Sequence, residues 1–139
     1  MKTLGLIIGL ALTGLITSAQ DNTGATVKVT IENVHSDEGT IMAALHTADT
    51  FMKGQGISDD AISAQTGEVT LTFKNIKPGT YAIMVLHDEN DNERMDYEAN
   101  GMPKERYVTT GTVELYGPPT FEGAKFDLTD KDLEFRFRF

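Results

Sequence analysis

The chain has 139 residues, no cysteine and no tryptophan, and its formal net charge at pH 7 is −9. Without cysteine it can form neither a disulfide nor a lipoprotein anchor on cysteine, and it has no cysteine nucleophile. Its acidity disfavours nucleic acid and anionic membranes as partners and favours cations.

The first 19 residues have the organisation of a secretory signal peptide. A short start containing Lys2 precedes an uncharged apolar run at residues 4–16. A membrane span needs about 20 residues, so this run is too short for one. Small residues at 17–19 suit signal-peptidase cleavage, and we expect the mature chain to begin at Gln20. The sequence therefore predicts export to the periplasm or the extracellular space, with no integral membrane segment after cleavage.

Residues 20–139 are expected to form a single domain, because they contain no linker, repeat or low-complexity tract. Apolar and polar residues alternate at residues 26–34 and again at residues 40–46, with a turn between them. Residues 47–67 are less regular, and we expect a long loop or a short helical turn there.

Two further strands and a final one complete the predicted pattern. Residues 68–74 alternate again, and a tight turn leads into residues 80–87, which are apolar on both faces. This is typical of a central strand that is covered on both sides. An irregular stretch follows, and residues 133–139 form the expected last strand, with its phenylalanines in the core. Together these features predict an all-β fold, an antiparallel β-sandwich of about seven strands with long loops.

Residues 87–105 concentrate oxygen ligands more than any other stretch. Four side chains occupy positions 1, 3, 5 and 9 of a curling loop, namely Asp88, Asn90, Asn92 and Asp96. This spacing turns alternate side chains towards one hard cation, and the carbonyl of Arg94 at position 7 is a further candidate ligand. Calcium is the natural candidate, because it accepts carboxylate, amide and carbonyl oxygens in flexible geometry.

The EF-hand pattern is only partly met in this loop. The glycine that makes the sharp turn at position 6 is replaced by Glu93, and the bidentate glutamate at position 12 is replaced by Ala99. We therefore expect a calcium site in a β-protein loop, closed by Glu98 or Glu105, instead of a helix-loop-helix hand. The alternative is a solvated acidic turn whose Asp and Asn side chains bond their own backbone.

Catalytic residues are not expected. The three histidines are scattered, and no nucleophile-elbow motif G-x-S-x-G occurs. His87 ends the central strand and is expected to bond a nearby backbone group or carboxylate. His35 and His46 are expected to be structural or exposed.

The motifs of the chain also support a family resemblance. The segment at residues 73–82, with Pro78-Gly79-x-Tyr81, resembles a hairpin of transthyretin-like and carboxypeptidase-regulatory-like sandwiches. The order of all motifs is similar to that of an uncharacterised exported bacterial family, domain-of-unknown-function family 2141. These motifs are Pro78-Gly79-x-Tyr81-Ala82, His87-Asp88-Glu89-Asn90-x-Asn92, Met95-Asp96, Gly101-x-Pro103-x-Glu105 and Gly117-Pro118-Pro119-x-Phe121-Glu122-x-Ala124.

The resemblance covers essentially the whole mature chain. It implies a transthyretin-like or immunoglobulin-like sandwich in the bacterial envelope, and it brings no established activity. This chain has Asp91 and Glu93 where the family usually has glycine.

These observations favour an exported, non-enzymatic module, stabilised by calcium, with a binding or structural role and a glycan or envelope protein as partner. A carbohydrate-binding module is one alternative, for which Tyr97, Tyr107 and Tyr116 are the loop tyrosines. The other is a hydrolase on a transthyretin-like scaffold. The known hydroxyisourate hydrolases of that scaffold end Tyr-Arg-Gly-Ser, whereas this chain ends Phe-Arg-Phe-Arg-Phe.

Overall fold

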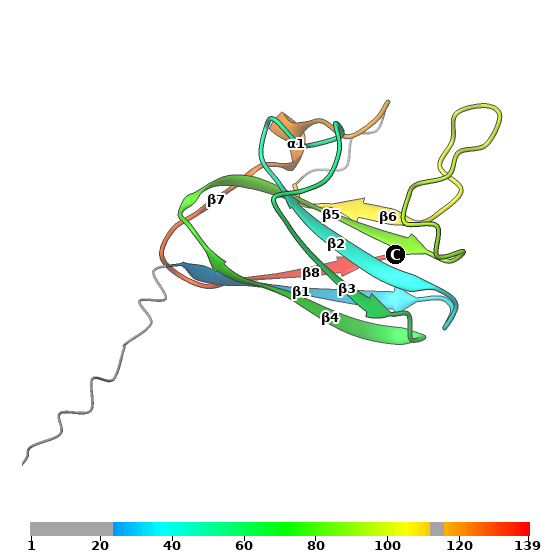
Figure 1. Cartoon of the computed structure of the whole chain (residues 1–139), viewed down its shortest axis with the longest axis horizontal. Coiled ribbons are helices and arrows are strands. Elements are labelled where there is room, and N and C mark those ends of the chain that lie inside the picture. Colours follow the sequence, from blue (N-terminus) through cyan, green and yellow to red (C-terminus); the bar gives the residue numbers. More distant parts are fainter. Residues whose placement is uncertain (1–23, 112–115) are drawn as a thin grey trace, which may run out of the picture.

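The computed structural model describes residues 24–111 and 116–139, so the expected signal peptide lies outside the described residues. The regular secondary structure of the described residues is β-strand except for one short helix, as Figure 1 shows. Its elements are β1 (Ala25–Val34), β2 (Thr40–His46), β3 (Ser58–Ser63), β4 (Gly67–Ile76), β5 (Gly79–Asp88), β6 (Tyr107–Thr109), α1 (Phe121–Ala124), β7 (Phe126–Leu128) and β8 (Leu133–Arg138).

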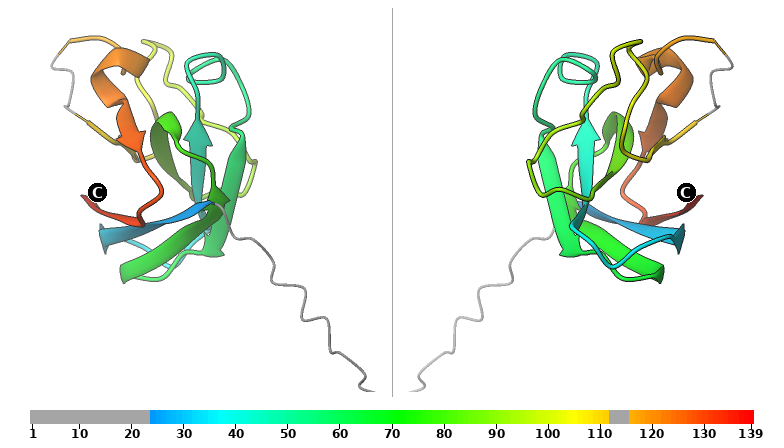
Figure 2. Two further views of the ribbon diagram at one scale, coloured as in Figure 1. Left: turned by 90° about the vertical axis from the view of Figure 1, so that its left-hand side faces the viewer. Right: turned by 90° about the vertical axis from the view of Figure 1, so that its right-hand side faces the viewer.

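Two sheets face each other (Figures 1 and 2). One has the strand order β4-β1-β8 and the other the order β3-β2-β5-β6, with β7 also pairing β5. The pairs are antiparallel except for β8, which runs parallel to β1. The prediction of an all-β sandwich dominated by antiparallel pairs is confirmed.

The core lies between the sheets. It results from the alternation of apolar and polar residues along each strand. On β1, Val27, Val29 and Ile31 are fully buried, and they face the inner side chains of β2 and β5. Because alternate residues point to opposite faces of a strand, the apolar positions of each strand meet in one layer. The phenylalanines of β8 pack against this cluster, as predicted, while Arg136 and Arg138 are exposed.

Strand β5 is buried on both faces, as its sequence predicts. Ile83 and Val85 belong to the core between the sheets. On the other face, Ala82 and Met84 pack with Phe51 and the residues of α1 in a second, smaller cluster. Figure 1 shows α1 and the loop at residues 47–57 on this outer side of the sheet. The acidic loop therefore begins at the end of a strand that is held rigidly by packing on both faces.

Three strands were not predicted individually. The described residues form eight strands, of which β3 lies inside the stretch expected to be a loop, β6 follows the acidic loop and β7 follows α1. Strand β3 is mostly polar and pairs with β2 through backbone bonds, so it leaves no alternating apolar signal. Asp60 ties it to the opposite sheet, because its Oδ2 accepts the backbone N–H of Thr72 at 2.9 Å.

Within the described residues, no helix has the length and apolarity to cross a membrane.

Candidate functional site

The acidic loop comprises residues 88–106 and has two parts. Its base, residues 88–96 and 104–106, is joined by backbone bonds from His87 to the Arg106 carbonyl at 2.9 Å and from Lys104 to the Asp96 carbonyl at 2.8 Å. Its tip, residues 97–103, is a small hairpin in which Glu98 donates its N–H to the Met102 carbonyl at 2.7 Å. The base therefore closes on itself, and the tip projects from it (Figure 1).

Asp88 organises the first turn of the base. It pairs with Thr40 at the end of β5, and it is 1% exposed. Its Oδ1 accepts the backbone N–H of Asn92 at 3.2 Å, and its Oδ2 accepts that of Glu93 at 2.7 Å. A buried carboxylate is stable only when it is well paired, and these bonds supply the pairing.

The turn at positions 4 and 6 of the pattern has the backbone conformation of glycine. Asp91 has a φ of 53° and Glu93 a φ of 62°. A non-glycine residue in this left-handed region costs about 1–2 kcal/mol. The sharp turn that the EF-hand pattern assigns to glycine is thus present here, although Glu93 occupies that position.

Asn90, Asn92 and Asp96 converge in the base. Both amide nitrogens donate to Asp96 Oδ2, from Asn90 at 2.8 Å and from Asn92 at 2.6 Å. The hydrogen bond from Asn90 is the largest cause that lowers the pKa of Asp96 below its usual value, and the bond from Asn92 and the charge of Arg94 lower it further. Asp96 is therefore held as a carboxylate.

The two candidate closing glutamates lie in different places. Glu105 is in the base, where its Oε2 accepts the backbone N–H of Asp96 at 2.6 Å. Glu98 is in the tip and is exposed. Arg94 is also exposed, and its Nε lies 3.7 Å from Asp96 Oδ1. The structure therefore brings Asp88, Asn90, Asn92, Asp96 and Glu105 to the base and leaves Glu98 outside it.

The donor set of the base suits a hard cation with mixed oxygen ligands. Among the described residues, no group of three or more His, Cys, Asp or Glu side chains is arranged to hold a metal ion. A cation at the base would therefore need amide and carbonyl oxygens as well as carboxylates, a mixture that calcium accepts. A half-turn of the Asn90 and Asn92 amides would present their Oδ1 atoms where their Nδ2 atoms now contact Asp96. The bonds from Asp88 to its own loop are equally those of the solvated turn, so calcium stays a prediction.

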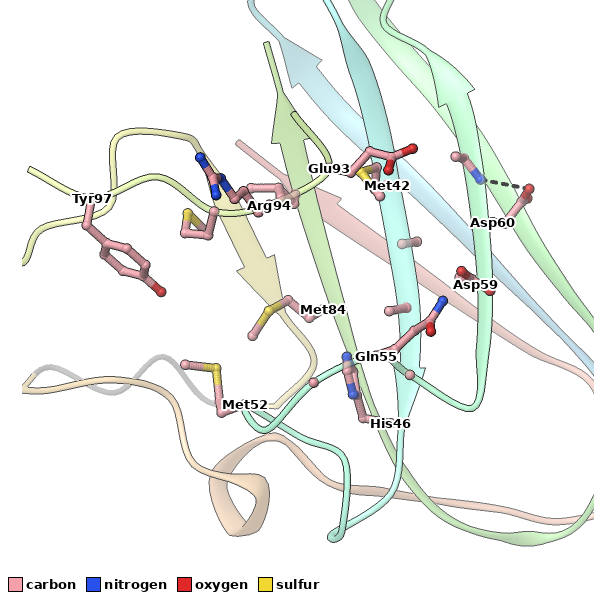
Figure 3. A pocket seen from close by; sticks show the side chains of 17 residues that line it. Met42, His46, Met52, Gln55, Asp59, Asp60, Met84, Glu93, Arg94 and Tyr97 are labelled. Atoms are coloured by element: carbon pink, nitrogen blue, oxygen red, sulfur yellow. Dashed lines mark hydrogen bonds between the residues drawn. The ribbon is translucent and has the colours of Figure 1, made fainter. Parts of the chain in front are cut away.

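A groove on the outer face of the β3-β2-β5-β6 sheet lies beside the loop (Figure 3). It consists of two adjoining hollows of about 930 Å³ and 520 Å³. The hollows share four lining residues, namely Met52, Met84, Met95 and Tyr97. The acidic loop supplies one wall, and residues 52–56 supply another. Sequence reasoning missed this groove, although methionine on the second apolar face of residues 80–87 and in an acidic loop was a usable signal.

The three histidines lie in three separate environments. His87 is fully buried between the sheets, and its Nε2 donates to the Glu38 carbonyl at 2.8 Å, which confirms its predicted backbone bond. His46 is buried on the outer face, 3.1 Å from Thr50 Oγ1, and burial lowers its pKa. His35 is exposed beside Asn33. The fold therefore does not gather them into one site.

A comparison with protein families places these features in a known group. Residues 29–136 match the model of a family described as "Uncharacterized protein conserved in bacteria (DUF2141)". The chain belongs to this family. The match to DUF2141 extends from β1 into β8, so it includes the acidic loop and the groove. Neither the curated proteins nor the solved structures gave a significant match.

Proposed function

We propose that this protein is an exported module of the bacterial envelope that binds a partner without catalysis, and that calcium at the base of the acidic loop stabilises it. The observation that carries the proposal is the convergence of Asn90, Asn92 and Asp96 beside Glu105 at the base, at the end of a strand buried on both faces. The signal-peptide pattern of residues 1–19 supports export.

Calcium has a physical reason to bind at the base. The chain is strongly acidic, and at the base Glu105 accepts the backbone N–H of Asp96, so these two acidic residues are neighbours. A divalent cation would offset their repulsion, and a ligand that binds only the folded state raises its stability by mass action. Bound calcium would also fix Met95 and Tyr97, which form the wall of the groove on the loop side. Calcium binding would therefore order the groove for its partner.

The test is thermal unfolding of residues 20–139 in calcium and in chelator. We expect the melting temperature to be higher in calcium, and calorimetric titration to show one saturable site. Asp96→Asn should abolish most of the difference, because Asp96 lies at the centre of the base. Asp130→Asn is the matched control, since it removes the same charge from an exposed turn before β8. Coincident transitions without any heat of binding would contradict the proposal.

A carbohydrate is the second candidate ligand, because two of the predicted loop tyrosines line the smaller hollow. Tyr97 is 54% exposed and Tyr107 lies beside it in the lining, together with Pro118 and Pro119. Sugar-binding sites use exposed aromatic faces as platforms, since aromatic rings combine apolar area with a polar edge. Tyr116 is 92% exposed and is not among the lining residues of either hollow. A glycan array with Tyr97→Ala as the comparison variant separates a sugar-binding role from a structural one.

A further inference from the structure

The methionines of the described chain gather in one place. The sequence has six methionines, of which Met1 lies outside the described residues. The other five all line the groove, namely Met42, Met52, Met84, Met95 and Met102. They come from β2, β5, the loop at residues 47–57 and the acidic loop, so no local sequence repeat explains the cluster.

Three of these methionines line both hollows. Met84 rises from the sheet, Met52 comes from the loop at residues 47–57, and Met95 comes from the acidic loop. Figure 3 shows the ends of the Met52 and Met84 side chains turned towards each other across the groove. The side chains of Met52 and Met84 thus face the same part of the groove, and Met95 lines it from the acidic loop.

Packing alone does not account for this arrangement. Methionine is a common filler of irregular cores, because it is flexible and polarizable. Yet no methionine is among the buried core residues of the described chain, and Met84 alone packs against a core cluster, the small one of Phe51, Ala82 and Ala124. Met52 is 49% exposed and Met102 is 60% exposed, so these two side chains fill no core. Their sulfurs are available to a ligand.

We infer that the groove is a thioether site for Cu(I), with Met52, Met84 and Met95 as the ligands. Thioethers are soft, uncharged donors that select Cu(I) over hard cations such as calcium. The chain has no cysteine, so methionine is its sole source of sulfur ligands. The net negative charge of the chain favours cations, and Glu93 lies on the lining of the same groove.

Binding needs no electron transfer or proton release, because copper enters and leaves as Cu(I) and thioethers carry no proton. The imidazole of His46 lines the same hollow and is a further nitrogen donor near the sulfurs. This inference goes beyond the calcium proposal and does not rest on it, since the soft sulfurs and the hard oxygens of the base are different ligands.

The experiment is an anaerobic competition titration of residues 20–139 with Cu(I) against a chromogenic Cu(I) chelator, with and without calcium. We expect one Cu(I) per chain. Each of Met52→Leu, Met84→Leu and Met95→Leu should lower the affinity more than about 10-fold, since loss of a supporting residue alone costs about 10–100-fold. Leucine keeps the apolar volume of methionine, so these variants should fold.

Met42→Leu and Met102→Leu are the matched controls, because each residue lines only one hollow. They should change the affinity less than the three shared positions do. Methyl NMR of the methionines with Ag(I) as a redox-inert probe supplies a second measurement, in which the Met52, Met84 and Met95 signals should shift together. Transfer of all Cu(I) to the chelator by the native protein, or unchanged binding in the triple leucine variant, would overturn the inference.

Discussion

The base and the tip of the acidic loop are built from similar residues and differ in what holds them. The base contains a buried carboxylate, two converging amides and a backbone bond to Glu105. The tip is an exposed hairpin, held by backbone bonds at Glu98 and Gly101 and by a bridge from Tyr97 to Pro103. Acidic residues alone therefore do not identify a cation site. The base differs from the tip because it lies next to the end of β5, where its side chains are hydrogen-bonded.

The largest expected effect concerns two glycines, Gly39, which lies against the base, and Gly101, which lies in the tip. Gly39 has a φ of 73°, and an added Cβ would overlap the carbonyl oxygen of Asp88 and lie 2.6 Å from the Cα of Glu89. Gly39→Ala should therefore reduce the free energy of unfolding by about 2–4 kcal/mol, from the left-handed strain and the displaced backbone together.

Gly101→Ala is the matched variant in the tip. Gly101 has a φ of 84°, but an added Cβ would meet open space. Only the left-handed strain remains, so the loss should be about 1 kcal/mol. Urea unfolding of both variants measures the difference, and equal losses would show that the base is no more constrained than the tip.

A smaller effect is expected from the two glutamates. Glu105→Gln keeps an oxygen that can accept the Asp96 N–H but removes a charge from the base. It should lower the calcium affinity about 10-fold or more, by the scale of lost metal-site partners. Glu98→Gln removes the same charge from the tip and should leave the affinity nearly unchanged. Calorimetric titration distinguishes them, and a larger loss for Glu98→Gln would move the closing ligand to the tip.

The smallest effect is the pH dependence of the calcium-free protein. The folded pKa of Asp96 is lowered, first by the Asn90 hydrogen bond, so the folded state holds fewer protons than the unfolded chain. Its contribution is full above the unfolded value near 3.9 and is lost as the pH falls through the lowered folded value. Asp96→Asn should flatten this acid limb in urea unfolding at stepped pH, whereas Asp130→Asn should not. Parallel acid limbs in all three proteins would contradict the hydrogen-bonded base.

The sequence predicts those strands in which the pattern of apolar residues reflects which faces are buried. The strands with alternating apolar residues and the doubly covered β5 were predicted, because burial on one or both faces sets their composition. Strand β3 was not predicted, because it is held by backbone pairing and by Asp60 and therefore has no alternating apolar residues. The parallel pairing of β8 with β1 is a matter of topology that no local pattern encodes.

The candidate site was predicted in the same uneven way. Three of the residues in the predicted spacing, Asn90, Asn92 and Asp96, form one hydrogen-bonded cluster, because loop residues close in sequence stay close in space. That they hold calcium stays a prediction. The choice between Glu98 and Glu105 depended on the hairpin at residues 97–103, which brings Glu105 back to the base. The methionine groove joins segments far apart in the chain, so the sequence shows its methionines singly and only the fold shows that they line one groove.

The most direct test of the central claim is a calcium titration followed by the backbone amide signals of residues 20–139. Extracellular calcium modules bind at about 10⁻⁴–10⁻³ M. In that range the amides of Asn92, Glu93 and Asp96, which bond the side chains of the base, should shift to saturation together, while those of Val27 and Val29 in the core stay fixed. Unchanged signals for the three loop amides throughout that range would contradict calcium binding at the base.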